Sequence, residues 1–164
     1  MRIDKFTTKF QQALADAQSL AIGSDQQFIE PQHLLLALIN QDDGGTTSLL
    51  ARAGVNVPGL KRDLEQALTR LPKVEGHGGD VSIGRDLGNL LNLTDKEAQK
   101  RGDQFIASEM FLLALGEDKG EAGRLAKQHG LSRKALEAAI MAVRGGKGVD
   151  SQEAEGQRKK KKKY

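Results

Sequence analysis

The amino-acid sequence contains an internal repeat, and this repeat limits the fold more than any other feature. The segment 27–38 returns at a constant offset of 77 as 104–115, with seven of the twelve aligned positions identical. The register continues at an offset of 76, which aligns Gly54 with Gly130 and Leu60 with Leu136. A duplication predicts two similar units that bury an apolar face against each other, because either unit alone has too small a core.

Each half has the pattern of four helices. Apolar residues spaced by three or four run from Phe6 to Ala21, with Thr7 placed to cap this helix and Gly23 to end it. Pro31 opens a second helix, and the continuous apolar run at 34–39 predicts that this helix is central. Two more helices are expected at about 46–53 and 58–71. In the second half the matching stops and caps are Gly102, Ser108, Gly130 and Ser132.

These patterns predict an all-α fold of eight helices in two tandem four-helix repeats, related by a pseudo-two-fold axis. Strand-like alternation is nowhere evident. We expect repeat one at 1–72, a glycine-rich linker at 73–84 and repeat two at 85–145. The polar composition of 146–164 predicts a flexible tail, because such a segment has too little apolar surface to bury.

The net charge of +3 depends on the tail. Residues 158–163 supply six of the 25 basic residues, so 1–157 carry 19 basic and 22 acidic residues and a net charge of −3. A mildly acidic domain argues against nucleic acid as a partner, and the lysines lack the aromatic neighbours that stack bases. The chain has no cysteine, no pattern of a secretory signal and no apolar run long enough for a membrane span. We therefore expect a cytoplasmic protein without a membrane partner.

The titratable residues show no catalytic or metal-binding pattern. His33, His77 and His129 lie far apart, and none has a second ligand at metal spacing. The carboxylate pairs sit at helix ends, with no nucleophile and base in a common frame. We predict no enzyme activity and no cofactor for these residues.

A comparison of the two repeats singles out Leu93. It lies about 120 degrees from the inward stripe of its helix, and its counterpart in the first half is Asp16, so the position tolerates water. Met110 replaces His33 in the sixth helix and could line a shallow apolar groove with Leu93, with Leu113 of the same helix as a further candidate. The alternative is that these residues are ordinary core contacts.

The repeats resemble the Clp repeat domain at the amino terminus of Hsp100 AAA+ unfoldases. The resemblance covers about 1–145, and the segments 28–38 and 101–106 carry it. It implies a domain that binds apolar segments of unfolded or aggregated proteins and passes them to an ATP-driven ring. The sequence contains no Walker A motif, so ATP and magnesium are expected only in ATPase modules beyond these residues.

The resemblance also implies roles for polar residues. It selects Thr7, Asp103 and Glu109 for coupling to clients or to the ATPase ring. Structural roles explain these residues equally well: Thr7 as a helix cap, Asp103 as a loop residue and Glu109 as a carboxylate in the first turn of a helix. Glu97 stands where similar proteins tend to carry an apolar residue, which predicts a more polar groove.

The function expected from the sequence is client binding, with docking of a folded adaptor or regulator as the alternative. The resemblance implies a homohexamer in full length and an Hsp70-type chaperone partner that binds through other regions. A nucleic-acid-binding tail at 158–163 is a further rival, and deletion of the tail with a salt titration would test it.

Overall fold

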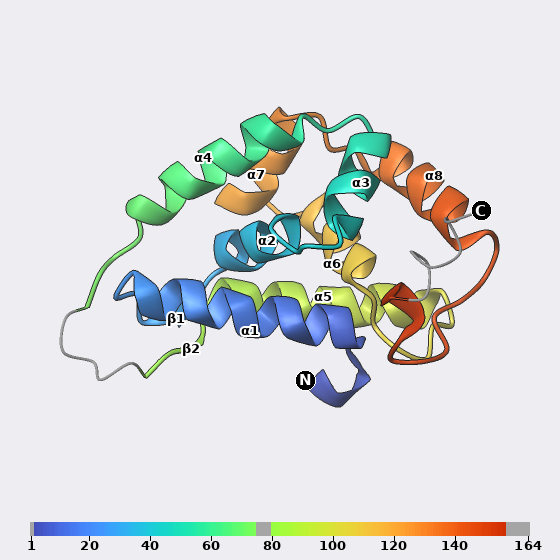
Figure 1. Ribbon diagram of the computed structural model, residues 1–164, viewed down its shortest axis with the longest axis horizontal. Coiled ribbons are helices and arrows are strands. Elements are labelled where there is room, and N and C mark those ends of the chain that lie inside the picture. The colour runs from blue at the N-terminus through green and yellow to red at the C-terminus, as the bar shows by residue number, and fades with distance from the viewer. Residues whose placement is uncertain (1, 75–79, 157–164) are drawn as a thin grey trace.

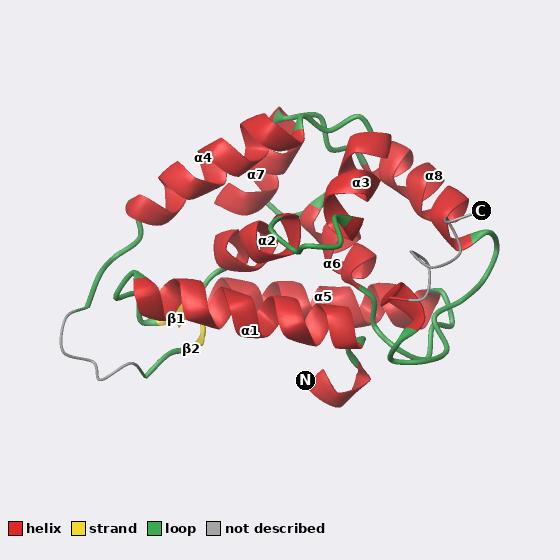
Figure 2. Ribbon diagram, in the orientation of Figure 1, coloured by secondary structure: helices red, strands yellow, loops and turns green. Residues whose placement is uncertain are grey.

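The computed structural model describes residues 2–74 and 80–156, and the regular secondary structure of these residues is almost all helical (Figure 1, Figure 2). The prediction of an all-α fold is confirmed. No helix in these residues has the length and apolar character needed to cross a bilayer. The elements are η1 (Ile3–Lys5), α1 (Thr8–Gly23), β1 (Phe28–Ile29), α2 (Pro31–Ile39), α3 (Gly45–Arg52), α4 (Val57–Thr69), β2 (Ser82–Ile83), α5 (Arg85–Lys100), α6 (Ser108–Leu115), α7 (Glu121–Gln128) and α8 (Arg133–Arg144).

The helices of the two repeats pack in equivalent pairs. Helix α1 packs on α2 in the first repeat, and α5 packs on α6 in the second. The outer helices cross between the repeats: α3 lies against α8, and α4 lies against α7 (Figure 1). Because each outer pair contains one helix from each half, neither half has a complete core of its own.

Two short backbone pairings repeat the same relationship. Ile29 pairs with Ile83 in a two-stranded parallel sheet, and Phe6 pairs with Ile106 in an isolated parallel bridge. An offset of 77 turns the second pair into the first with the halves exchanged. The expectation that the chain lacks strands is corrected at this one point, since residues 82–83 of the predicted linker form β2; residues 75–79 lie outside the described residues.

Two of the three predicted helix caps are present: the side chains of Thr7 and Ser132 accept hydrogen bonds from backbone amides in the first turns of α1 and α8. Asn56, which was not predicted, caps α4 in the same way. The prediction that Ser108 caps α6 is wrong, because the cap position is Ala107 and Ser108 is the first helical residue. The Ser108 amide and hydroxyl instead donate to the carboxylate of Glu155.

Helices α2 and α6 form the centre of the molecule. Every residue from Pro31 to Ile39 is buried, and so is every residue from Ser108 to Leu115. Their apolar sequences suit this position, because a helix enclosed on all sides has no solvated face.

The chain beyond α8 packs against the domain. Val149 is buried, and its carbonyl accepts hydrogen bonds from the amides of Gln104 and Phe105 at 2.8 and 3.1 Å. The amide of Thr8 donates to Gln152 O at 2.9 Å. The prediction of a flexible tail at 146–164 is therefore corrected for 149–155. This segment has little apolar surface, and one buried side chain with several backbone hydrogen bonds attaches it to the domain instead. The lysine run lies outside the described residues.

Candidate functional site

Leu93 is exposed on the outer face of α5. Its side chain is 42% accessible, and its counterpart Asp16 on α1 is also exposed. The prediction of an apolar residue facing water where the other repeat carries a charge is confirmed. Exposed apolar residues indicate a binding surface only when they form part of a larger site, so the neighbours of Leu93 decide its meaning.

The predicted groove between Leu93 and Met110 is absent. Met110 and Leu113 are completely buried inside α6. Met110 is turned away from Phe111 and Leu115 by helical spacing. It is buried nonetheless because α6 is covered on every side, a property of the tertiary packing that a helical wheel does not contain.

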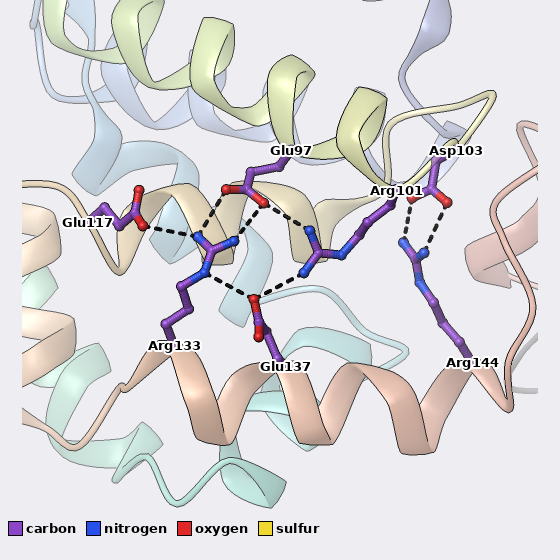
Figure 3. Close-up of polar contacts among 7 residues, drawn as sticks. All are labelled: Glu97, Arg101, Asp103, Glu117, Arg133, Glu137 and Arg144. Carbon is purple, nitrogen blue, oxygen red and sulfur yellow. Dashed lines mark hydrogen bonds and ion pairs between the residues drawn. The ribbon is translucent and has the colours of Figure 1, made fainter.

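Glu97 lies one turn beyond Leu93 and is the buried member of an ion-pair cluster that extends to the surface (Figure 3). Both of its carboxylate oxygens accept from Arg133 at 2.9 Å, and one also accepts from Arg101 at 2.9 Å. Glu137 accepts from both arginines at 3.0 and 3.2 Å, and Glu117 accepts from Arg133 at 3.3 Å. Glu97, which was predicted to line a groove, therefore links α5 to α8 through ion pairs, and we call this linkage the ion-pair joint.

The electrostatics of this cluster favour the charged forms. The bonds from Arg133 lower the pKa of Glu97, in spite of its desolvation. The bonds to Glu97 raise the pKa of Arg133 further above its ordinary value. Two-pronged arginine to carboxylate pairs are geometrically specific, so this cluster fixes the spacing of α5 and α8.

A surface hollow of about 310 Å³ lies where the carboxyl-terminal ends of α5 and α8 meet. Its apolar lining comes from Ile140 and from Met141, whose side chain is 71% accessible. Arg101 and Glu137 supply charge beside it. Since positions four apart share a helix face, Leu93, Glu97 and Arg101 form a row that leads to the hollow. We call Leu93, Arg101, Glu137, Ile140 and Met141 the α5–α8 surface.

The three polar residues selected by resemblance lie near one another, and Asp103 also lines the hollow. Asp103 accepts two bonds from Arg144 at 3.0 and 2.8 Å, and Glu109 accepts one at 2.9 Å. The Asp103 side chain is inaccessible, so it is not a solvated loop residue. Glu109 occupies the first turn of α6, as expected. Thr7 is buried, caps α1 and donates to Glu155.

Sequence reasoning missed Arg133, Glu137, Met141 and Glu155. Met141 could have been found by the geometry that identified Leu93, because it faces away from the buried stripe of α8 formed by Leu136, Ala139 and Ile140. The arginine to glutamate joint leaves no such signal. Its partners lie 36 residues apart, and only the fold brings them together.

The described residues contain no group of three or more histidine, aspartate or glutamate side chains placed to hold a metal ion. His33 is buried in α2 and bonds to Gln26 Oε1 at 2.7 Å and to the Glu30 amide at 2.9 Å. His129 contacts Asp63 at 2.7 Å between α7 and α4. His77 lies outside the described residues. The two described histidines therefore act as connections within the fold.

The fold and the family identify the class of protein. The structure resembles the Hsp104 N-terminal domain from Candida albicans, with a TM-score of 0.79, 24% identity and coverage of 92% of this chain and 99% of the other. It also resembles the N-terminal domain (1-163) of the ClpV1 ATPase from E. coli, with a TM-score of 0.72, 25% identity and 83% coverage of each chain. At such identities these similarities establish the fold.

Residues 5–129 match the Clp repeat (R) N-terminal domain family, and the chain belongs to this family. It is 51% identical to the chaperone protein ClpB of Vibrio cholerae over 94% of its own length, and 46% identical to that of Pseudomonas putida over 100%. It spans only 18% and 19% of those proteins. The prediction that these residues form a chaperone amino-terminal domain and not an ATPase module is confirmed.

Proposed function

We propose that the α5–α8 surface binds segments of unfolded or aggregated proteins in which apolar and charged side chains alternate. The exposure of Leu93, where the other repeat carries Asp16, is the observation on which this proposal rests. Met141 adds a second apolar side chain, and its flexible thioether suits varied partners. Arg101 and Glu137 provide charges of both signs beside it.

The affinity of such a surface is low. Two exposed apolar side chains and a shallow hollow remove little area from water, and the loss of motion on association offsets much of that gain. Several copies in one assembly raise the effective concentration of sites. Weak binding suits a domain that passes its client on, and we assign the next step to the ATP-driven hexameric ring of full-length relatives. ATP, magnesium and the Hsp70-type partner belong to that ring in this proposal, and its location is the cytoplasm.

A titration of the isotope-labelled chain with a permanently unfolded protein, such as reduced and carboxymethylated α-lactalbumin, tests the surface. We expect shifts at Leu93 and Met141 and a loss of affinity of about tenfold in the double variant Leu93→Ser, Met141→Ser. The matched control is Ile22→Ser, Phe28→Ser, which removes two exposed apolar side chains from the first repeat. Equal losses in both variants would refute the assignment.

The second candidate is a dock for a folded adaptor or regulator. One relative of known structure is described as a complex of the ClpV N-domain with VipB peptide, with 20% identity and a TM-score of 0.66. In that case the shifts should centre on the loop 101–104, and the Leu93→Ser, Met141→Ser variant should bind as well as the parent chain.

A further inference from the structure

The carboxylate of Glu155 lies where the amino-terminal ends of α1 and α6 meet. One of its oxygens accepts from the Ser108 amide at 2.8 Å, from the Ser108 hydroxyl at 3.1 Å and from the Thr7 hydroxyl. Backbone amides and the helix dipole favour negative charge at such ends. The Glu155 carboxylate of the same chain therefore occupies the anion-binding position at these helix ends.

The repeat places an equivalent junction, with a different carboxylate, where the amino-terminal ends of α2 and α5 meet. The cap residues there are Glu30 and Gly84, the counterparts of Ala107 and Thr7. The carboxylate of Glu30 lies so close to Gly84 that a Cβ on this glycine would be 2.5 Å from Oε1. Glu30, the cap residue of α2, thus fills the α2–α5 junction, with a glycine opposite to make room. The α1–α6 junction has a small Ala107 and a larger Thr7.

Several neighbouring contacts hold the segment that carries Glu155. The Val149 amide donates to Asp103 at 3.2 Å, and its carbonyl accepts from Gln104 and Phe105. The Thr8 hydroxyl donates to Glu153 at 2.7 Å. Arg144 bonds Asp103 and Glu109 beneath the segment. Figure 1 shows this segment beside the amino-terminal end of α1.

We propose that residues 149–155, which we call the strap, are a detachable internal ligand that docks Glu155 at the α1–α6 junction and so sets the orientation of this domain relative to the chain that follows. Thr7, Asp103 and Glu109 then act together on the strap, since Thr7 binds Glu155, Asp103 holds Val149, and Glu109 orients Arg144 and repels Glu155. The strap adjoins the hollow of the α5–α8 surface, since Asp103 and Arg144 also line that hollow. The proposal does not depend on client binding.

The charges around Glu155 make docking sensitive to pH. Burial, followed by repulsion from Glu109, outweighs the hydrogen bonds from Thr7 and Ser108 and raises the pKa of Glu155 to about 7. A pKa raised above the free value means that docking is strongest at acidic pH and weakens as pH rises through about 7. Other charged residues near or within the strap are Arg144, which is bonded to Glu109 and Asp103, together with Asp150, Glu153 and Lys9.

Amide hydrogen exchange on the whole 164-residue chain measures docking directly. The amides of Thr8, Gln104, Phe105 and Ser108 all donate to strap atoms. In Glu155→Ala we expect their exchange to accelerate at least tenfold after correction for intrinsic rates, with the interiors of α1 and α6 unchanged. The control Glu65→Ala removes an exposed carboxylate from α4 and should leave all four amides protected.

A transplant of the other junction gives an independent test. In Thr7→Gly, Ala107→Glu the α1–α6 junction receives the two cap residues of the α2–α5 junction, so the new carboxylate should displace Glu155 and free the amides of Thr8, Gln104 and Phe105 while the fold is kept. In Glu155→Gln the protection of these amides should no longer change between pH 6 and pH 8. Unchanged exchange in both Glu155→Ala and the transplant would overturn the proposal, and so would a uniform loss of protection throughout α1 and α6.

Discussion

The two repeats share a backbone plan but differ in how they use the same positions. The first repeat has His33 in its central helix, the second has Met110, and both side chains are buried. The first has Leu20 and Val57 where the second has Glu97 and Arg133, which are joined by two 2.9 Å bonds. The first has Asp16 where the second exposes Leu93. The duplication preserved packing, while charge and exposure changed at individual equivalent positions.

Replacement of His33 by methionine, the residue at the equivalent position of the second repeat, should have the largest effect on stability. Burial lowers the pKa of His33 to about 4, so the unfolded chain takes up a proton before the folded chain does. The lowered pKa of His33 adds to the free energy of unfolding above about pH 6.5. This stabilisation of about 3 kcal/mol is lost as the pH falls toward 4. Urea unfolding of the parent and of His33→Met at pH 7 and pH 4.5 measures this. The variant should lose less stability on acidification, and an equal loss in both proteins would contradict the cause.

Replacement of the ion-pair joint by the residues of the first repeat should have the next largest effect. Arg133→Val leaves Glu97 with one partner in a nearly inaccessible site and should lower the free energy of unfolding by about 2 kcal/mol. The double variant Glu97→Leu, Arg133→Val should regain most of this loss, because Leu20 and Val57 fill those positions in the first repeat.

Arg62→Val is the control for this pair. The Arg62 side chain is 70% accessible, and its nearest carboxylate is 3.9 Å away. The free energy of unfolding of Arg62→Val should differ from that of the parent chain by less than about 0.5 kcal/mol. A double variant no more stable than Arg133→Val would show that the charged joint contributes more than an apolar one.

The equivalent glycines that end α3 and α7 should differ by a smaller amount. Both have positive φ angles, +89° at Gly54 and +109° at Gly130, so an alanine is strained at either position. A Cβ at Gly130 would also lie 2.8 Å from the Gly54 carbonyl oxygen, whereas a Cβ at Gly54 meets nothing within 4 Å. Thermal unfolding should show a loss of about 1 kcal/mol for Gly54→Ala and about 2 kcal/mol for Gly130→Ala.

An exchange of the surface residues should have the smallest effect on stability. Leu93→Asp and Asp16→Leu change exposed positions and should each alter the free energy of unfolding by less than about 0.5 kcal/mol. Binding to the unfolded probe should fall several-fold in the first variant, because the repeats then become alike. A large loss of stability in Leu93→Asp would mean that this side chain serves the core.

The sequence predicted what depends on local periodicity. The caps at Thr7 and Ser132, the central apolar helices and the exposure of Leu93 all follow from spacing along one helix and from alignment of the repeats. Burial of Met110 could not be predicted in this way, since it depends on which helices cover α6. The joint of Glu97 and Arg133 and the site of Glu155 link residues 36 and 47 positions apart.

The amino-acid sequence by itself determined the helices, their duplication and the exposure of Leu93, because helical spacing and repeat alignment are properties of the chain read in order. Only the tertiary structure decided that Met110 and Leu113 are core, that Glu97 is a joint and that Glu155 lies at the α1–α6 junction. The physical reason is that burial and ion pairing depend on which distant segments of the chain come into contact. The local pattern of a sequence does not specify these contacts.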